Sequence, residues 1–558
     1  MPASWLSNKF MELGLEVYSQ NFSMNHPLKK HTVVSGTNVY AIMRAPRMAS
    51  TEAVVLNLPF RKSNLPGVAL SLAVAKYFRR HAYWAKDVIF LVSEQDQLGV
   101  LAWLDAYHHH DDSNSDFLKS SNLESRAGSI LAAISLEILA DRVTTFDMQV
   151  EGLDGQLPNL DLFNLAVRLC HTENISPTFH GKANHRSPRS QKGYIHALTT
   201  MLSMVITQAS GQPSGNHGLF QRFNIEAVSM VGSRQKGTSY GFKQMGRVVE
   251  GIVRSLNNLL ERFHQSFFFY LLPSTDRYVS IGMYMPPFGL IVIPAVIKAL
   301  ALWIQMSTEQ TANDPMDQRR KLSTDGSTSE SGDSANKNGG ATLLSVLPML
   351  TMAHLMGVGL YIFTAPTWLL DMYKQLPTDH LLFYSIMSVG AAALFFPKLV
   401  MRHGKPGENI FIPSPDMLRC VALLELSLVL GTTSVMNFSL AAIIGIFTVP
   451  VLVCLVPRRS RVGTLLQMMV TVMVAPPVLL YIVILSSKLL VGVDGDVHTL
   501  AIQSYEEMVS AVFSSVTSGC IYGDWTYGLV TVVLFPIWLL FWCLVWGPVE
   551  EKVNCPEQ

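Results

Sequence analysis

The sequence predicts an α/β domain built on a mainly parallel sheet, followed by an all-α domain that crosses a membrane several times. Three observations carry this prediction. The 558-residue chain is 49% hydrophobic and only 15% charged, which is too apolar for a soluble protein of this length. In its first half, short apolar runs alternate with helical patterns. Beyond residue 270 the apolar runs approach about 20 residues, the length that crosses a bilayer.

Strands and helices alternate along the first domain, which we place at residues 1–270. Its strand-like runs are apolar on both faces, as in parallel sheets that helices cover on both sides. Ligand-binding residues gather at the carboxyl ends of such strands. The predicted strands are 53–58, 88–92, 130–139 and 225–231, and the predicted helices lie near 66–80 and 98–108.

The second domain, residues 271–558, holds about seven apolar runs that could be transmembrane helices. The run at 439–456 is short, so the number of spans can differ by about one. Segment 307–340 is polar and has no aromatic residue, so we expect a disordered cytosolic linker. The runs are 281–305, 343–364, 380–397, 417–435, 439–456, 464–487 and 528–547.

Basic residues in the short loops predict the orientation, because Lys and Arg are retained on the cytosolic side of a membrane. The loops after the third and fifth runs are basic, whereas loops 365–379 and 488–527 hold one Lys each. This places residues 1–270 in a lumen or outside the cell, where the sequons at Asn21 and Asn174 could be glycosylated. The basic loop residues are Lys398, Arg402, Lys405, Arg458, Arg459 and Arg461.

The net charge, the cysteines and the N-terminal residues narrow the possible partners, chemistry and mode of membrane insertion. A net charge of +1 argues against a nucleic-acid partner. The six cysteines give no disulfide framework, and Cys170 is expected to be a packing residue rather than a nucleophile. Residues 3–22 are amphipathic with interspersed charges, so the sequence shows no signal peptide at residue 1. We therefore expect either a missing upstream span or a first internal span that acts as the insertion signal.

The stretch around Ser93 and Glu94 has the form of an active site, with an apolar strand, an acidic turn and Gly99 opening a helix. Together with Glu137 and His217, it resembles the di-zinc aminopeptidase family between residues 35 and 240. The resemblance implies that Glu94, Glu137 and His217 stand at metal-ligand positions of that family.

Other parts of that site are missing. Ser93 stands where the family has its general base, and serine cannot take up a proton at neutral pH. Leu58–Phe60 replaces a His-x-Asp ligand pair, and Ser63 replaces the carboxylate that bridges two metals about 4 Å apart. We expect a pseudo-peptidase with no catalytic residue and no required cofactor. The three remaining ligand positions could hold one ion such as zinc, or could simply be satisfied by hydrogen bonds.

The run His108–Asp112 also has metal-binding residue types. Its histidines are consecutive and therefore point in different directions on a helix. We expect a solvated loop there.

Several long stretches resemble the family of GPI-anchor attachment proteins, which are subunits of the GPI transamidase, over essentially the whole chain. The family has one further span before the position of Met1. The stretches are VVSGTNVYAIMRAPR (33–47), YWAKDVIFLVSEQD (83–96), GLDGQLPNLDL (152–162), SGNHGLFQRF (214–223) and LLERFHQSFFFYLLP (259–273).

The resemblance implies a multi-pass protein of the endoplasmic reticulum membrane with its large domain in the lumen. Its complex removes a C-terminal signal from a proprotein and joins the new carboxyl group to a GPI lipid. The catalytic cysteine and histidine belong to a caspase-like partner subunit. This chain is therefore expected to be a non-catalytic subunit that binds the GPI lipid and scaffolds its partners.

A lipid site must offer polar groups above an apolar wall. His264, Gln265 and Ser266 precede the aromatic residues 267–270, just before the first apolar run, and could bind phosphate or sugar oxygens. Gln265 could also share a divalent cation such as Mg²⁺ with lipid phosphate. The alternative is an ordinary aromatic belt at the membrane interface.

The last apolar run holds Pro536 among aromatic residues. A proline frees a backbone carbonyl and kinks a helix. The resemblance implies that this run contributes to lipid binding, which makes Pro536 a second candidate beside a purely structural kink.

Two rival functions stay open at this point. One is a single-metal peptidase or amide synthetase that uses Glu94, Glu137 and His217. The other is a transporter, which intramembrane charges would favour, but the runs hold few charges apart from Lys298 and residues at their ends.

Overall fold

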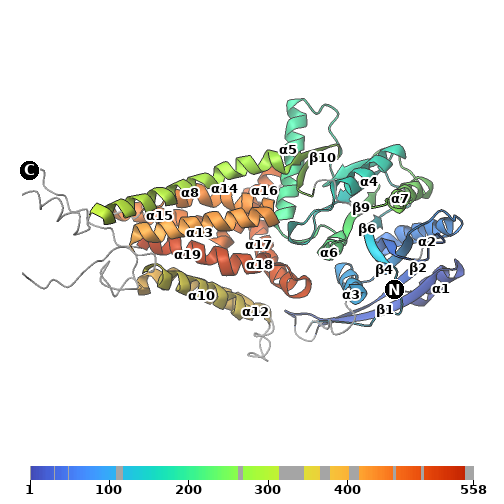
Figure 1. Ribbon diagram of the computed structural model, residues 1–558, viewed down its shortest axis with the longest axis horizontal. Helices are drawn as coiled ribbons and strands as arrows, with labels where there is room; N and C mark the ends of the chain where they lie inside the picture. Colours follow the sequence, from blue (N-terminus) through green and yellow to red (C-terminus); the bar gives the residue numbers. More distant parts are fainter. Residues whose placement is uncertain are drawn as a thin grey trace, which may run out of the picture. The chain divides into compact units, whose positions relative to one another are not determined.

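The computed structural model describes most of the chain, and Figure 1 labels its elements. The chain divides into two compact units. The first comprises residues 1–285, 436–440 and 514–526, and the second comprises 286–435, 441–513 and 527–558. The described residues are 2–29, 32–47, 50–108, 117–261, 268–312, 345–364, 378–400, 414–456, 460–491 and 496–546.

The first unit is built on a mixed sheet. Its described residues form nine strands in the order β5-β1-β2-β4-β3-β6-β9-β7-β8. The central strands β4, β3, β6 and β9 are parallel, which confirms the predicted α/β fold, whereas β1, β2, β5 and β7 make antiparallel pairs. The strands are β1 (Glu16–Asn25), β2 (Val33–Met43), β3 (Glu52–Pro59), β4 (Asp87–Ser93), β5 (Leu118–Ser120), β6 (Ser129–Ile138), β7 (Thr145–Gln149), β8 (Ser176–Phe179) and β9 (Glu226–Ser233).

Helices cover both faces of this sheet. Alternate residues of β4 pack into separate cores: Val88 and Phe90 into one, Ile89 and Leu91 into the other. The first core includes residues of α1, α2, α4 and α7, and the second includes residues of α3 and α6. The helices are α1 (Ala3–Glu12), α2 (Leu65–Arg79), α3 (Gln97–His108), α4 (Leu160–Thr172), α5 (Gln191–Ala209), α6 (His217–Arg222) and α7 (Phe242–Asn257).

Two further pieces complete the first unit. A hairpin of β10 (Tyr270–Ser274) and β11 (Arg277–Ser280) follows the helices. The short segment 436–440 belongs to this unit as well, and Asn437 donates a 2.9 Å hydrogen bond to the carbonyl oxygen of Gln208. Tyr270 is buried and donates a 2.9 Å hydrogen bond to the carbonyl oxygen of Pro158. The prediction that Tyr270 belongs to an aromatic wall at the membrane is therefore wrong.

The second unit is helical. Among the described residues, five helices are long and apolar enough to cross a membrane, or six if α15 and α16, which meet at 67°, form one bent span. The 17-residue α14 is shorter, so this number is below the seven that we expected. The helices are α8 (Ile281–Ala312), α10 (Leu347–Thr364), α12 (Thr378–Val400), α13 (Pro415–Met436), α14 (Phe438–Cys454), α15 (Arg461–Met473), α16 (Pro476–Val491), α17 (Val497–Tyr522), α18 (Thr526–Gly528), the π-helix η5 (Leu529–Leu534) and α19 (Phe535–Trp546).

Two predicted connections differ from the structure. Most of the predicted loop 488–527 is helical, because the 26-residue helix α17 lies within it. The polar composition of α17 does not indicate a helix in the sequence. Residues 307–312 of the predicted linker continue α8, and the remainder, 313–340, lies outside the described residues.

Candidate functional site

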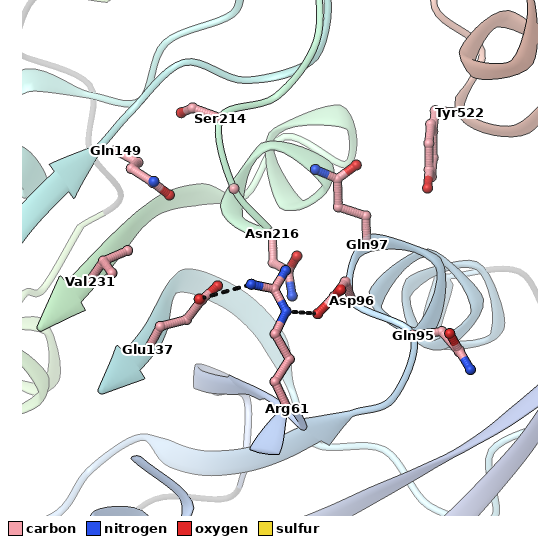
Figure 2. A pocket seen from close by; sticks show the side chains of 11 residues that line it. Arg61, Gln95, Asp96, Gln97, Glu137, Gln149, Ser214, Asn216, Val231 and Tyr522 are labelled. Carbon is pink, nitrogen blue, oxygen red and sulfur yellow. Dashed lines mark hydrogen bonds and ion pairs between the residues drawn. The ribbon is translucent and has the colours of Figure 1, made fainter. Parts of the chain in front are cut away.

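A cleft of about 380 Å³ lies where the central parallel strands of the sheet end (Figure 2). Its walls follow from the topology, because parallel strands bring their carboxyl ends to one edge. Arg61 follows β3, Gln95–Gln97 follow β4, and Glu137 lies near the end of β6. The lining residues are Arg61, Gln95, Asp96, Gln97, Glu137, Gln149, Ser214, Gly215, Asn216, Val231 and Tyr522.

A guanidinium group joins two carboxylates across this cleft (Figure 2). Arg61 Nε lies 2.5 Å from Asp96 Oδ1, and Arg61 Nη1 lies 3.2 Å from Glu137 Oε2. Burial raises the pKa of Glu137 above its usual range, the Arg61 charge opposes this rise and Asp96 adds to it. The cationic group between these carboxylates belongs to the chain itself.

Glu94 faces away from this pair. Its Oε2 accepts a 2.8 Å hydrogen bond from the backbone N–H of Thr37 on β2, and its own N–H donates to Asn38 Oδ1 at 3.2 Å. Gly99 is required close by, because a β-carbon there would clash with the carbonyl oxygen of Glu94. Glu94 therefore ties the turn after β4 to β2 and does not line the cleft.

His217 is turned into the protein core. It is fully buried, and its Nδ1 lies 2.8 Å from Ser229 Oγ. Burial lowers the pKa of His217 to about 4, so the imidazole is neutral at physiological pH. The preceding residue, Asn216, lines the cleft instead.

The described residues do not fit the metal ions that aminopeptidase-like folds carry. Of the three predicted ligands, only Glu137 lines the cleft, and its partner is Arg61. Within the described parts of the chain, no three His, Cys, Asp or Glu residues lie close enough to hold a metal. His108 is the last residue of α3, and the remainder of the predicted run, 109–112, lies outside the described residues.

Ser93 lies in a neutral hydrogen-bonded chain. It is fully buried, and its hydroxyl donates to Asn57 Oδ1 at 3.0 Å. The Asn57 amide in turn donates to Ser135 Oγ at 3.1 Å. These polar groups satisfy one another beneath the cleft, and none of them is a base at neutral pH.

A buried acidic group behind the cleft was not predicted. Glu151 Oε1 lies 2.7 Å from His180 Nε2, and Glu151 Oε2 accepts a 2.8 Å hydrogen bond from Ser214. Burial acts to raise the pKa of Glu151, but the bond and charge of His180 outweigh it and lower the pKa overall. This cluster fixes the segment 213–216 that forms one wall. Its members are far apart in the sequence and share no motif.

The end of α17 and the turn after it, residues 514–526, form another part of the first unit. The backbone N–H of Trp525 donates to Asp154 Oδ1 at 3.1 Å, and Asp154 and Asp524 are hydrogen-bonded to each other. Burial and the neighbouring Asp524 carboxyl raise the pKa of Asp154 to about 8. This segment carries Tyr522 into the cleft wall, a role that the predicted loop did not indicate.

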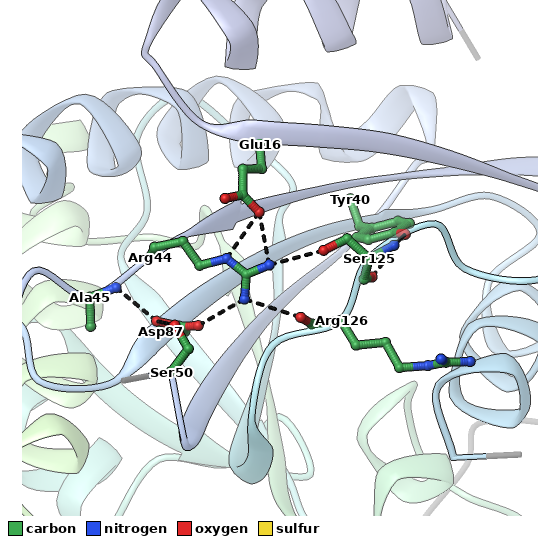
Figure 3. A network of polar contacts seen from close by, with 8 residues as sticks. All are labelled: Glu16, Tyr40, Arg44, Ala45, Ser50, Asp87, Ser125 and Arg126. Carbon is green, nitrogen blue, oxygen red and sulfur yellow. Dashed lines mark hydrogen bonds and ion pairs between the residues drawn. The ribbon is translucent and has the colours of Figure 1, made fainter. Parts of the chain in front are cut away.

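Arg44 lies at the centre of a second polar network in the same unit (Figure 3). Arg44 Nη2 lies 2.8 Å from Glu16 Oε2, and Arg44 Nη1 lies 3.2 Å from Asp87 Oδ2. Asp87 is fully buried and also accepts a 2.7 Å bond from the N–H of Ala45. This network closes the amino end of β4, opposite the cleft, and its role is structural.

The predicted lipid contacts are only partly described. His264, Gln265 and Ser266 lie in the gap 262–267, outside the described residues. Pro536 is buried near the start of α19, directly after the π-helix η5. Its ring packs directly against Gly357 of α10, where a β-carbon would lie only 2.7 Å from Pro536 Cγ. The π-helix η5 and the proline are thus adjacent, as expected where a proline removes a helical hydrogen bond.

The helical unit holds a polar pair that the sequence did not indicate, in addition to Lys298. His354 Nε2 on α10 lies 2.7 Å from Glu425 Oε1 on α13, and His354 Nδ1 lies 3.2 Å from the carbonyl oxygen of Val532. Both residues lie in candidate spans. Because polar groups are costly within a membrane, such a pair is a strong packing constraint between these helices.

The predicted glycosylation sites are accessible. Asn21 on β1 is exposed, and its Oδ1 accepts a 2.9 Å hydrogen bond from Thr37. Asn174 is exposed in the turn between α4 and β8.

These features define a multi-pass membrane protein with an α/β domain whose cleft holds a guanidinium between two carboxylates. The model of the family "Gaa1-like, GPI transamidase component" matches residues 35–542, and the chain belongs to this family. The resemblance drawn from the sequence is thereby confirmed.

Two relatives agree with this placement. The chain is 31% identical to GPI transamidase component gaa1 of Schizosaccharomyces pombe over 54% of its own length and 51% of the relative's. It is 28% identical to GPI transamidase component GAA1 of Saccharomyces cerevisiae over 74% of its own length. The chain thus spans 51% and 59% of the lengths of these two relatives.

The solved structures that match are more distant. A zinc-dependent exopeptidase from Parabacteroides distasonis matches 46% of this chain and 88% of its own, at 9% identity and a TM-score of 0.25. Glutaminyl cyclase from Porphyromonas gingivalis matches 46% of this chain and 87% of its own, at 12% identity and a TM-score of 0.26.

Proposed function

We propose that this protein is a non-catalytic subunit of the GPI transamidase that binds the GPI lipid and scaffolds a caspase-like catalytic partner. It acts in the endoplasmic reticulum membrane, with the α/β unit in the lumen. Family membership supports the complex, and the apolar helices support the membrane. The orientation follows from the basic loops of the sequence.

One observation carries the non-catalytic role. The Arg61 guanidinium lies between Asp96 and Glu137, where a hydrolase of this fold would need a metal and a base. Ser93 is buried in a neutral network and Glu94 is engaged by the Thr37 backbone. The residues of the cleft therefore offer neither an activated water nor a nucleophile.

The lipid-binding role is assigned to His264, Gln265, Ser266 and Pro536. The polar triplet follows the last helix of the α/β unit and precedes α8 by a short hairpin, so it is close in sequence to the start of a membrane span. Imidazole, amide and hydroxyl groups can hydrogen-bond phosphate and sugar oxygens, and Gln265 can share Mg²⁺ with a lipid phosphate.

The test is Glu94→Gln, which keeps the shape of the side chain but removes its charge. In cells that lack the endogenous protein, surface display of a GPI-anchored reporter should stay within about twofold of wild type, because the residue is structural. Co-purification of the other subunits measures assembly. A loss of about 100-fold with assembly intact would show that Glu94 takes part in catalysis.

A further inference from the structure

The cleft keeps an unused hydrogen-bonding capacity. Asn216 is 2% exposed, lines the cleft, and its Nδ2 has no hydrogen-bond partner among the described residues. In Figure 2 the Asn216 side chain extends from the segment 214–216 toward the Arg61 guanidinium. A buried donor without a partner is costly, so a ligand that accepts from it relieves that cost.

The remaining lining is rich in groups that both donate and accept. Gln149 carries an amide and Tyr522 a hydroxyl. Gln95 and Gln97 donate their amide N–H groups to the carbonyl oxygens of Ser35 and Pro213 at 3.4 Å and offer their own oxygens as acceptors, and the Ser214 hydroxyl, which donates to Glu151, can still accept. Gly215 permits the close approach of Gln149, because a β-carbon there would lie 2.5 Å from Gln149 Oε1. A ligand with several hydroxyl groups matches such walls, since each hydroxyl can also donate and accept.

The charge of the cleft excludes anions. Arg61 supplies one positive charge, and its Nε and Nη1 are already engaged by Asp96 and Glu137. A phosphate or a free carboxylate would approach two carboxylates that one guanidinium only partly neutralises. The chemistry therefore favours a neutral ligand.

Tyr522 adds a flat apolar surface. Burial raises the pKa of Tyr522 to about 12, so its hydroxyl stays protonated and can donate. An aromatic ring with a polar tip can pack against the C–H face of a sugar while its hydroxyl reaches the ring substituents. The volume of about 380 Å³ lies in the lower part of the range for small-ligand pockets, about 300–1,000 Å³.

We infer that the cleft is a carbohydrate-binding site that takes a neutral sugar ring or disaccharide through Asn216, the glutamine amides and Tyr522. The inference extends the proposed function, because the glycan of a GPI lipid and the glycan of a glycoprotein are both sources of such a sugar. It does not depend on the lipid contacts at 264–266 or Pro536.

Ligand-observed NMR on the full chain in phosphatidylcholine nanodiscs tests the site, with α-mannobiose and N,N′-diacetylchitobiose as probes. We expect one of them to bind with a Kd of about 1 mM or tighter. Asn216→Leu and Tyr522→Leu should each weaken binding about tenfold, whereas Gln191→Leu, an exposed amide on α5, should leave it unchanged. Tyr522→Phe, which keeps the ring, should lose less than Tyr522→Leu.

The arms separate the possible outcomes. Tighter binding of the mannose probe points to a GPI-type glycan, and tighter binding of the chitobiose probe points to a glycoprotein. Inorganic phosphate or N-acetyl-glycyl-glycine methylamide binding more tightly than both sugars would overturn the inference. No sugar binding up to about 10 mM would also overturn it, and would leave the Glu94→Gln result on the proposed function untouched.

Discussion

Arg61 Nη1 lies 3.2 Å from Glu137 Oε2, so the cation in this cleft is supplied by the loop that follows β3. The same guanidinium contacts Asp96 in the turn after the neighbouring strand β4. A single side chain thus ties together the ends of three parallel strands, at the edge where such sheets bind their ligands.

Arg61→Gln removes this tie and should lower the free energy of unfolding by about 1 kcal/mol, because the pair is partly exposed. The pKa of Glu137 should rise further, since the Arg61 charge holds it down. Thermal unfolding of the purified chain measures the effect, with the exposed Arg168→Gln as control. Added Zn²⁺ should stabilise the variant more than wild type, because two carboxylates lose their cation. Equal stabilisation of both proteins would contradict the account.

Asp154→Asn should stabilise the protein at neutral and basic pH. The folded-state pKa of Asp154 is about 8, above its usual range, so its contribution to stability is full below pH 4 and is lost as the pH rises toward 8. Asparagine keeps a neutral group beside Asp524 at every pH. We expect a gain of about 1 kcal/mol at pH 8, reduced by solvent screening, and none at pH 4. A pH-independent change measured by thermal unfolding would show that the carboxyl pair is not the cause.

Replacing one member of the His354–Glu425 pair should lower the free energy of unfolding more than replacing both. Glu425→Leu or His354→Leu leaves one polar partner inside the helical unit and should cost about 3 kcal/mol. The double variant should recover much of this loss, since neither polar group is then unpaired. Unfolding in nanodiscs is the measurement, with the exposed His380→Leu as control. Additive losses in the double variant would rule out the coupling.

Lipid retention tests the membrane-proximal candidates. Gln265→Ala with Ser266→Ala should reduce the GPI lipid that co-purifies with the complex about tenfold, because two hydrogen-bonding groups are lost. Pro536→Ala should reduce it as well, whereas Pro450→Ala, an exposed proline within α14, should not. Mass spectrometry of the extracted lipid gives the amount. Unchanged retention in both variants would remove these residues from the site.

The sequence predicted the elements whose signal is local. The apolar runs 53–58, 88–92, 130–139 and 225–231 correspond closely to β3, β4, β6 and β9, because strands covered on both faces are apolar throughout. Helix α17 was missed, since its mixed composition resembles that of a loop. The antiparallel pairing of β1 with β2 depends on contacts that no single segment encodes.

The candidate site was predicted only in part. Glu137 lines the cleft as expected. Its partner Arg61 was not predicted, because the sequence around it indicated only that metal ligands are absent there. His217 faces the core, and its neighbour Asn216 lines the cleft in its place. The sequence alone does not specify which of these two adjacent residues at the start of α6 points into the cleft. Glu151 and His180 meet through the fold alone, 29 residues apart.

The most direct test of the central claim compares two variants in one assay of GPI attachment. In cells lacking the endogenous protein, Glu94→Gln should support surface display of a GPI-anchored reporter within about twofold of wild type, whereas Gln265→Ala with Ser266→Ala should reduce it about tenfold at equal complex assembly. The opposite pattern, loss with Glu94→Gln and full display with the paired variant, would contradict a lipid-binding, non-catalytic subunit.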